Sequence, residues 1–276
     1  MICFAANSVL ARLALREEEI DGGTFTVVRI FSGAVVLALL VSLRGERLST
    51  LRGHGSWSAA LALFGYAVAF SFAYLWLDAG VGALILFAAV QVTMIAVGMI
   101  RGERLRTSEW IGLALALVGL VYLVSPGLTA PSLAGATFMA ISGVAWGFYS
   151  LAAKGARSPI AATAANFGRA APMAAAVLLA VWLADRLHAS LIGIELAMIS
   201  GAVTSGLGYS MWYMALKGLR TSRAAIVQLT VPVIAAFAGV MFLDEQMTWR
   251  LALAGAAILG GVALALLGSR PATPRS

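Results

Sequence analysis

Ten long apolar segments, separated by short loops, decide what this chain can fold into. We place them at about residues 1–15, 24–43, 57–77, 81–100, 109–125, 132–153, 160–184, 191–216, 222–243 and 249–268. A helix that crosses a membrane needs about 20 predominantly apolar residues. Charged residues make up only 11% of the chain, against about 25% in an average soluble domain. We therefore predict an all-α membrane protein with ten transmembrane helices.

Basic residues are concentrated in every second loop, which predicts how the chain is oriented. They follow segments two, four, six and eight and close the chain: Arg44, Arg47, Arg52, Arg101, Arg104, Arg106, Lys154, Arg157, Lys217, Arg220, Arg223, Arg270 and Arg275. The other loops carry acids instead, in residues 17–21, at Asp78 and at Asp244-Glu245. Because basic loops stay on the cytoplasmic side, both termini are predicted to be cytoplasmic.

The two halves of the chain resemble each other. Residues 88–97 read AAVQVTMIAV and residues 225–235 read AIVQLTVPVIA, so Gln91 matches Gln228. Further matches follow in the same order: Ser8 with Ser150, Arg29 with Arg169, Gly112 with Gly255 and Gly119 with Gly261. A unit of five helices is odd in number, so the second copy would be inserted upside down.

We therefore predict two inverted five-helix repeats, residues 1–127 and 132–270, followed by a short tail at residues 271–276. Inverted repeats are typical of transporters with a central substrate site. Far fewer apolar residues precede Ser8 than precede Ser150. Either the first helix is unusually short or the sequence begins inside it, and the second explanation is favoured.

Aromatic and polar side chains recur at steps of three and four residues, which places each set on one helix face. The sets are Tyr66, Phe70 and Tyr74 in segment three; Ser142, Trp146 and Tyr149 in segment six; and Ser205, Tyr209, Trp212 and Tyr213 in segment eight. Such faces favour a central cavity with aromatic walls, and plain packing is the alternative. The candidate substrate-binding residues are Asn7, Tyr74, Trp76, Gln91, Trp146, Tyr149, Tyr209, Trp212, Tyr213 and Gln228. Near the segment ends, Trp57, Trp110, Trp182 and Trp249 are better explained as an aromatic belt at the membrane surface.

The paired glutamines and two arginines are the polar groups deepest in the segments. An amide in hydrocarbon is costly without a partner, so Gln91 and Gln228 bind either the solute or a neighbouring helix. Arg29 and Arg169 are candidate gating or structural residues, which either extend to the nearer interface or anchor a carboxylate. Pro232 belongs with them, because a proline inside segment nine should kink it and free the carbonyl of Gln228.

Several chemistries are excluded by composition. The chain has one cysteine and two histidines, which do not cluster with acids, so we predict no metal, no cofactor and no catalytic site. Acids are missing from the segment centres, which favours export down a gradient, although proton coupling through an acid such as Glu195 remains an alternative. Nucleic acid is not an expected partner.

The repeats and a set of short motifs resemble the drug/metabolite transporter superfamily, in particular its EamA-type ten-helix carriers. The motifs are Ala145-Trp146-Gly147, Arg29, Gly102-Glu103, Gly112 and Gly119. The chain departs from the family at Phe4-Ala5, which replaces a Trp-Gly pair, and in segment four, which lacks the proline that segment nine has.

The resemblance covers essentially the whole chain and implies a protein of the bacterial inner membrane. Such a protein exports small metabolites, among them amino acids including aromatic ones, by alternating access. The expected partners are a small-molecule substrate and the lipid bilayer, with the chain acting as a monomer or a homodimer. A membrane-embedded enzyme and a lipid-binding scaffold are the alternative functions.

The predicted orientation can be tested by labelling single cysteines in intact cells. A cysteine at position 19 should react with a membrane-impermeant maleimide, because the acidic loop is expected to face outward. A cysteine at position 104 should react only after the membrane is opened. Labelling at 104 but not at 19 in intact cells would reverse the orientation.

Overall fold

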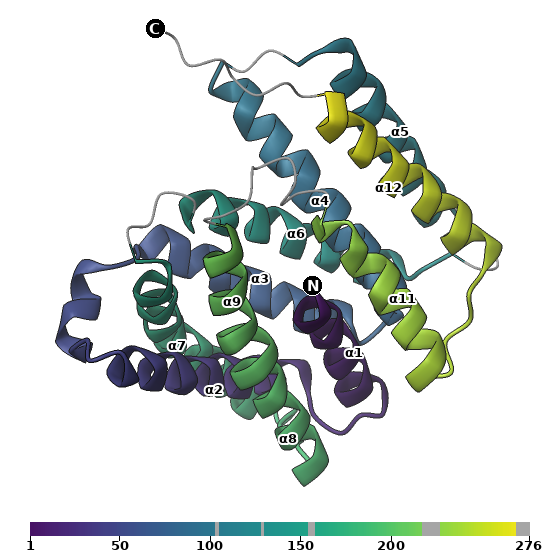
Figure 1. Cartoon of the computed structure of the whole chain (residues 1–276). Helices are drawn as coiled ribbons and strands as arrows, with labels where there is room; N and C mark the ends of the chain where they lie inside the picture. The colour runs from purple at the N-terminus through teal and green to yellow at the C-terminus, as the bar shows by residue number, and fades with distance from the viewer. Residues whose placement is uncertain (103–104, 128–129, 154–157, 217–226, 269–276) are drawn as a thin grey trace, which may run out of the picture.

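The computed structural model describes residues 1–102, 105–127, 130–153, 158–216 and 227–268, except for the side chains of Ala153, Tyr213, Leu216 and Gly268. Within these ranges the chain forms helices and no strand, and one isolated antiparallel bridge joins Ile20 to Ala189. The helices are α1 (Ile2–Arg16), α2 (Gly22–Leu43), the short 3₁₀ helix η1 (Leu48–Gly53), α3 (Trp57–Ala73), α4 (Ala79–Ile100), α5 (Thr107–Val124), α6 (Leu133–Ala153), α7 (Pro159–Leu183), α8 (Leu191–Ile199), the π-helix η2 (Ser200–Leu207), α9 (Gly208–Leu216), α11 (Thr230–Phe242) and α12 (Trp249–Gly268) (Figure 1).

The predicted all-α class is confirmed for the described residues, and each predicted apolar segment contains a helix. Six helices are long and apolar enough to cross a membrane: α2, α4, α5, α7, the continuous run from Leu191 to Trp212, and α12. Two shorter apolar helices, α3 and α11, lie below that length. The molecule is therefore helical and suited to several membrane crossings.

Polar residues at the segment ends start the helices. The Asp21 side chain accepts a hydrogen bond from the Thr24 backbone nitrogen at 2.8 Å at the start of α2. Ser56 caps α3 in the same way, and Ser190 caps α8. These side chains satisfy backbone donors that a helix leaves unpaired at its first turn.

Pro232 ends up in a different place from the one predicted. Residues 222–226 of segment nine lie outside the described residues, and α11 begins at Thr230, after a turn at Leu229. Pro232 therefore stands in the first turn of α11, where its missing N–H is tolerated. The sequence predicted a kink inside the segment, and the structure instead shows a break in the helix at Leu229, just before α11 begins. Pro172, by contrast, lies inside α7, which is assigned as one helix on both sides of it.

Glycines bring several helix backbones into direct contact. A Cβ atom on Gly112 of α5 would lie 2.3 Å from the carbonyl oxygen of Gly261 in α12, and one on Gly261 would lie 2.5 Å from that of Gly112. Figure 1 shows these two helices side by side over their length. Gly143 of α6 approaches the backbone of α4 equally closely, with 2.5 Å from its added Cβ to the Leu86 oxygen. Small residues of this kind hold helices together where water is absent.

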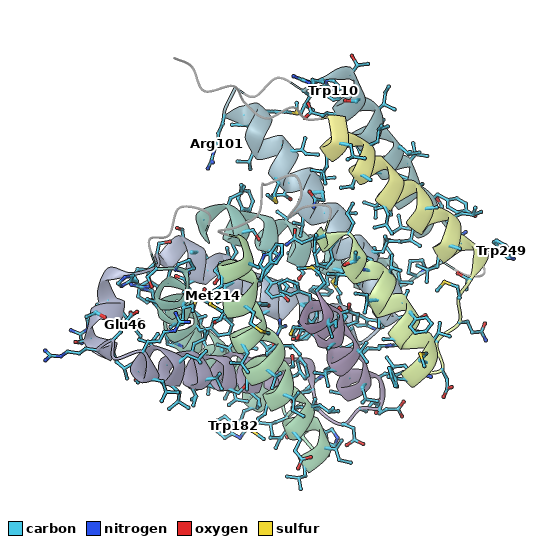
Figure 2. The ribbon with its side chains drawn as sticks, in the orientation of Figure 1. Glu46, Arg101, Trp110, Trp182, Met214 and Trp249 are labelled. Atoms are coloured by element: carbon cyan, nitrogen blue, oxygen red, sulfur yellow. The ribbon has the colours of Figure 1, made fainter. Side chains whose placement is uncertain are left out.

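Large tryptophans lie at the outer ends of the bundle. Trp110, Trp182 and Trp249 are exposed near the termini of α5, α7 and α12, and Figure 2 shows them at the edge of the molecule. Trp57 is likewise exposed at the start of α3. Exposed positions at helix ends are the ones that an interfacial belt requires.

Gly112→Ala should weaken the pairing of α5 and α12. The new methyl group would meet a backbone carbonyl that can retreat only if the helices separate, at a cost of about 1–3 kcal/mol. Gly260→Ala is the matched control, because no atom lies within 4 Å of a Cβ there. Thermal unfolding of the purified protein in detergent should show a lower Tm for the first variant only. Equal melting temperatures would mean that this contact does not limit stability.

Candidate functional site

A buried arginine lies where α2, α3, η2 and α9 meet. Arg29 of α2 is 2% exposed, so it does not extend to an interface, as one interpretation of the sequence required. Its Nη2 donates to the Tyr66 hydroxyl at 2.8 Å and to the Tyr209 hydroxyl at 3.3 Å, and its Nε donates to Ser205 at 3.3 Å. The guanidinium carbon lies 4.7 Å from the ring centre of Phe70 and 5.1 Å from that of Tyr66. Ring faces and hydroxyls therefore surround the charge.

Hydroxyl groups extend this cluster to α1. The Tyr66 hydroxyl also accepts from Asn7 Nδ2 at 3.4 Å and from the Tyr209 hydroxyl at 3.2 Å. Asn7 Oδ1 in turn accepts from Ser200 at 2.6 Å and from Thr204 at 3.0 Å. One connected polar network therefore joins α1, α2, α3, η2 and α9.

The π-helix η2 supplies the wall opposite α2. It spans Ser200–Leu207 inside an otherwise α-helical run, and such wide turns are frequent at functional sites. Gly201 permits the approach, because a Cβ there would lie 2.1 Å from the carbonyl oxygen of Arg29. The wide turn places Ser200, Thr204 and Ser205 on the buried polar network.

Aromatic rings form a layer against the network. The Trp146 ring lies 4.7 Å from that of Tyr66 and 4.8 Å from that of Tyr209, and Phe4 lies 5.6 Å from Tyr209. Tyr149 contacts Trp146 at 5.4 Å, and Trp212 contacts Phe4 at 6.1 Å. The layer is packed ring on ring.

The structure brings five of the predicted site residues together with Arg29, namely Asn7, Trp146, Tyr149, Tyr209 and Trp212. Tyr66, Ser200, Thr204 and Ser205 were not among the predicted site residues. Tyr66 and Ser205 were visible on helix faces from their spacing. The four-residue step between Ser200 and Thr204 places both hydroxyls on one helix face and is the sequence signal for this part of the network.

Other predicted residues lie elsewhere. Tyr74 is buried at the end of α3, donates to the Ala79 carbonyl at 3.4 Å and packs on Phe70. Trp76 is 46% exposed and stacks on Phe138. The Tyr213 side chain lies outside the described residues. Gln91 is buried on α4, and Gln228 is buried in the helical residues just before the turn at Leu229. Gln91 Nε2 has no hydrogen-bond partner in the described structure.

Arg169 and Pro232 lie away from the Arg29 network. Arg169 is partly exposed and donates to the carbonyl oxygens of His54 at 2.7 Å and Arg52 at 3.1 Å, which ties α7 to η1 and to the residue that follows it. Pro232 lines an apolar cavity of about 280 Å³ between α4, α11 and α12. Both positions fit structural roles.

A second polar cluster closes one end of the bundle. Arg12 of α1 donates to Asp78 at 3.2 Å and to the Tyr74 carbonyl at 3.0 Å. The Glu245 carboxylate accepts from the Ala79 backbone nitrogen at 2.9 Å, at the first turn of α4, where the helix dipole favours a negative charge. Arg16 donates to the Leu243 carbonyl at 2.6 Å, directly after α11. This acidic-end cluster therefore links α1, α4 and α11, and it borders a cavity of about 410 Å³.

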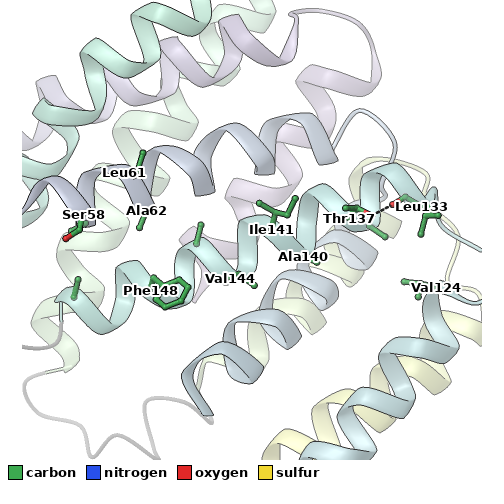
Figure 3. A pocket seen from close by; sticks show the side chains of 14 residues that line it. Ser58, Leu61, Ala62, Val124, Leu133, Thr137, Ala140, Ile141, Val144 and Phe148 are labelled. Atoms are coloured by element: carbon green, nitrogen blue, oxygen red, sulfur yellow. Dashed lines mark hydrogen bonds between the residues drawn. The ribbon is translucent and has the colours of Figure 1, made fainter. Parts of the chain in front are cut away.

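A larger groove between α3 and α6 is apolar. It measures about 860 Å³, and its wall is formed by residues such as Leu61, Ile141, Val144 and Phe148 (Figure 3). Ser58 and Thr137 are the polar side chains in its lining. Among the residues that the structure describes, no charged group lines this groove, so it offers little to a polar solute. Among the described residues, no group of three or more His, Cys, Asp or Glu side chains could hold a metal ion.

Comparison with known proteins gives matches over three quarters of the chain or more. The model of the EamA-like transporter family matches residues 1–125 and again residues 133–267. A protein of Pseudomonas aeruginosa described as uncharacterized is 50% identical over 96% of this chain and 91% of its own. A probable amino-acid metabolite efflux pump of Salmonella typhimurium is 28% identical over 75% of this chain and 77% of its own. A solved protein structure superposes with a TM-score of 0.67 at 23% identity and covers 96% of both chains, which shows a shared fold.

Apolar helices around a buried polar centre, together with these matches, define a multi-pass membrane transporter. The chain belongs to the EamA-like transporter family. The family predicted from the sequence is thereby confirmed.

The acidic-end cluster should make stability depend on pH. Burial away from water raises the pKa of Glu245, against the opposing hydrogen bond from Ala79. The folded protein then holds this proton more tightly than the unfolded chain does, so the stabilisation is complete at low pH and falls as pH rises through the window above the ordinary carboxyl value of about 4.3. Glu245→Gln should flatten the decline in Tm across that window.

Asp244→Asn is the matched control, because Asp244 is the exposed neighbouring acid. It should keep the wild-type slope of Tm against pH. Identical slopes for wild type and Glu245→Gln would show that the Glu245 proton does not contribute.

Proposed function

We propose that this protein exports a small organic metabolite, with amino acids as the first substrate class, across the bacterial inner membrane. Transport would proceed by alternating access of two inverted five-helix repeats, residues 1–127 and 132–270, with both termini in the cytoplasm. The observation that carries the proposal is the buried polar centre, to which both halves contribute. Asn7, Arg29 and Tyr66 come from the first half, and Trp146 and Tyr209 come from the second. Transporters built from inverted repeats place their substrate at such a repeat interface.

Helix packing supports the repeat. Under a five-helix repeat, α2 corresponds to α7, α4 to α11 and α5 to α12. Each of these pairs is in contact, as counterparts beside a two-fold axis must be. The contact of α3 with α6 has a counterpart in the contact of α8 and η2 with α1. The family model, which matches once in each half, agrees with this division.

The acidic-end cluster supports alternating access. Arg12, Arg16, Asp78 and Glu245 connect elements from both halves and close the end that the orientation argument places outside. A carrier of this kind must break those contacts before it releases solute outward. Ion pairs and single hydrogen bonds at a partly exposed site are weak enough to be broken in each cycle.

The amino-acid class comes from two supporting observations. The Salmonella typhimurium relative carries the name of an amino-acid metabolite efflux pump. Gln91 and Gln228 are buried and offer both donors and acceptors, which suits an ammonium or a carboxylate. We place both glutamines on the solute path.

Counterflow of labelled amino acids in sealed proteoliposomes tests this function, and it also tests the glutamines. Gln91→Leu and Gln228→Leu keep similar bulk and remove the amide. Each should raise the half-saturating concentration about two- to tenfold, because a hydrogen bond contributes about 0.5–1.5 kcal/mol.

Gln246→Leu is the matched control, because it makes the same change at an exposed residue of a loop. It should leave half-saturation unchanged. If the two buried variants also leave it unchanged, the amides only connect helices. If no labelled solute exchanges, the proposed function is wrong.

A further inference from the structure

We propose that Arg29 anchors a carboxylate of the transported solute, with the hydroxyls of Tyr66 and Tyr209 as additional donors. The inference rests on the proposed function, because it assigns a solute chemistry to the same central site. The solute class is a small organic acid with an apolar or aromatic side chain. The class includes amino acids and the corresponding 2-oxo acids.

Arg29 carries a charge that no acidic side chain among the described residues neutralises. Each ion pair formed by the described residues involves Arg12 or Arg16, and none involves Arg29. A guanidinium keeps its proton in proteins, so Arg29 is a permanent buried cation. Within the described chain its contacts are hydroxyls and ring faces, which are all neutral groups. The centre therefore carries a positive charge that an anionic solute would neutralise.

The cluster around Arg29 and Tyr66 has more hydrogen-bond donors than acceptors in the described structure. Three donors converge on the Tyr66 hydroxyl, from Asn7, Arg29 and Tyr209, although a hydroxyl has only two acceptor lone pairs. Arg29 Nη1 is buried and has no acceptor in the described structure. A carboxylate only accepts, and it offers about four lone-pair sites. It is therefore the group that this cluster lacks.

Other arginines of the described chain have different hydrogen-bond acceptors from Arg29. Arg12, Arg16, Arg169 and Arg250 each donate to backbone carbonyls or carboxylates. Arg29 donates only to hydroxyls in the contacts described. Arg169, its counterpart in the repeat, binds the carbonyls of His54 and Arg52 near the surface. An arginine that only holds helices together donates to backbone carbonyls or carboxylates, and Arg29 does not do so in the contacts described.

The geometry also fits an organic acid rather than a bare anion. The planar fork of an arginine matches the two oxygens of a carboxylate. Phe70 covers one face of the guanidinium, and the rings of Phe4 and Trp146 lie beside Tyr209. In this structure the Tyr66 and Tyr209 hydroxyls accept from Arg29 at the position where a carboxylate would bind. A solute would enter by separating them from Arg29.

The test compares carboxylates with the corresponding amides, in which a neutral carboxamide replaces the anionic group, on the purified protein. The probes are L-phenylalanine, phenylpyruvate and L-phenylalaninamide, with L-leucine, 4-methyl-2-oxopentanoate and L-leucinamide as a second set. Binding is measured by the shift in Tm and by the change in tryptophan fluorescence. We expect at least one acid to bind more tightly than its amide, and Arg29→Gln to weaken that acid about 10- to 150-fold, because hydrogen bonds to a charged group are the strong ones.

Several variants separate binding from folding. Arg29→Lys should give an intermediate affinity, since it keeps the charge and loses the fork. Tyr66→Phe and Tyr209→Phe keep their rings and should weaken only the acids, about two- to tenfold. These two tyrosine variants test the inference if Arg29→Gln does not fold. Arg169→Gln is the matched control and should leave the preference for acid over amide unchanged.

The inference is overturned if acids and amides bind alike, if no acid binds, or if the ratio of acid to amide affinity is unchanged in Arg29→Gln or in both tyrosine variants. Counterflow distinguishes this failure from failure of the proposed function. Exchange of a neutral or cationic solute, unaffected by Arg29→Gln, would keep the transporter and refute the carboxylate anchor. Binding of acids through Arg29 without exchange of any solute would refute the transport function.

Discussion

A permanent charge inside an apolar bundle is the constraint around which the central helices are arranged. Removing an ion from water costs several kcal/mol even after the protein has relaxed. Arg29 recovers part of that cost from ring faces, at about 0.5–2 kcal/mol per cation–π contact, and from hydroxyl acceptors on α3, η2 and α9. These partners come from segments that are far apart in sequence. Their convergence therefore fixes how α2, α3 and the α8–α9 run are placed relative to one another.

Close backbone contact makes this convergence possible. Gly201 lets η2 approach the backbone of α2 at Arg29. Gly33 lies one turn further along α2, and a Cβ atom added to it would lie 3.1 Å from the Gly201 carbonyl oxygen. A larger residue at Gly201 would meet the backbone of α2 at Arg29, and one at Gly33 would meet Phe167 and the backbone of η2. The small residues that pack these helices therefore also determine the geometry of the polar centre. In a chain with so few charges, packing and site chemistry are decided by the same positions.

The sequence predicted the helices better than the contacts between them. Apolar length and loop charges locate helices without reference to tertiary structure, so predicted and observed bounds agree within a few residues for most segments. The three-to-four spacing also identified faces that do pack, such as Tyr66, Phe70 and Tyr74. The partners of Arg29 depend on how helices cross, and the π-helix depends on local hydrogen bonding that composition does not encode. Trp76 was predicted as a site residue because it is aromatic, but the way the helices cross leaves it outside the Arg29 network.

Helix α1 connects the two polar clusters. Asn7 belongs to the network around Arg29, whereas Arg12 and Arg16 belong to the acidic-end cluster. Arg12 follows Asn7 by five residue steps, about 7.5 Å along a helix. An α-helix of this length moves as a unit, because its hydrogen bonds run along its axis. A displacement of α1 that separates Arg12 from Asp78 therefore also shifts Asn7 relative to Tyr66. Since Tyr66 is a direct partner of Arg29, opening that end of the bundle would change the donors available at the centre.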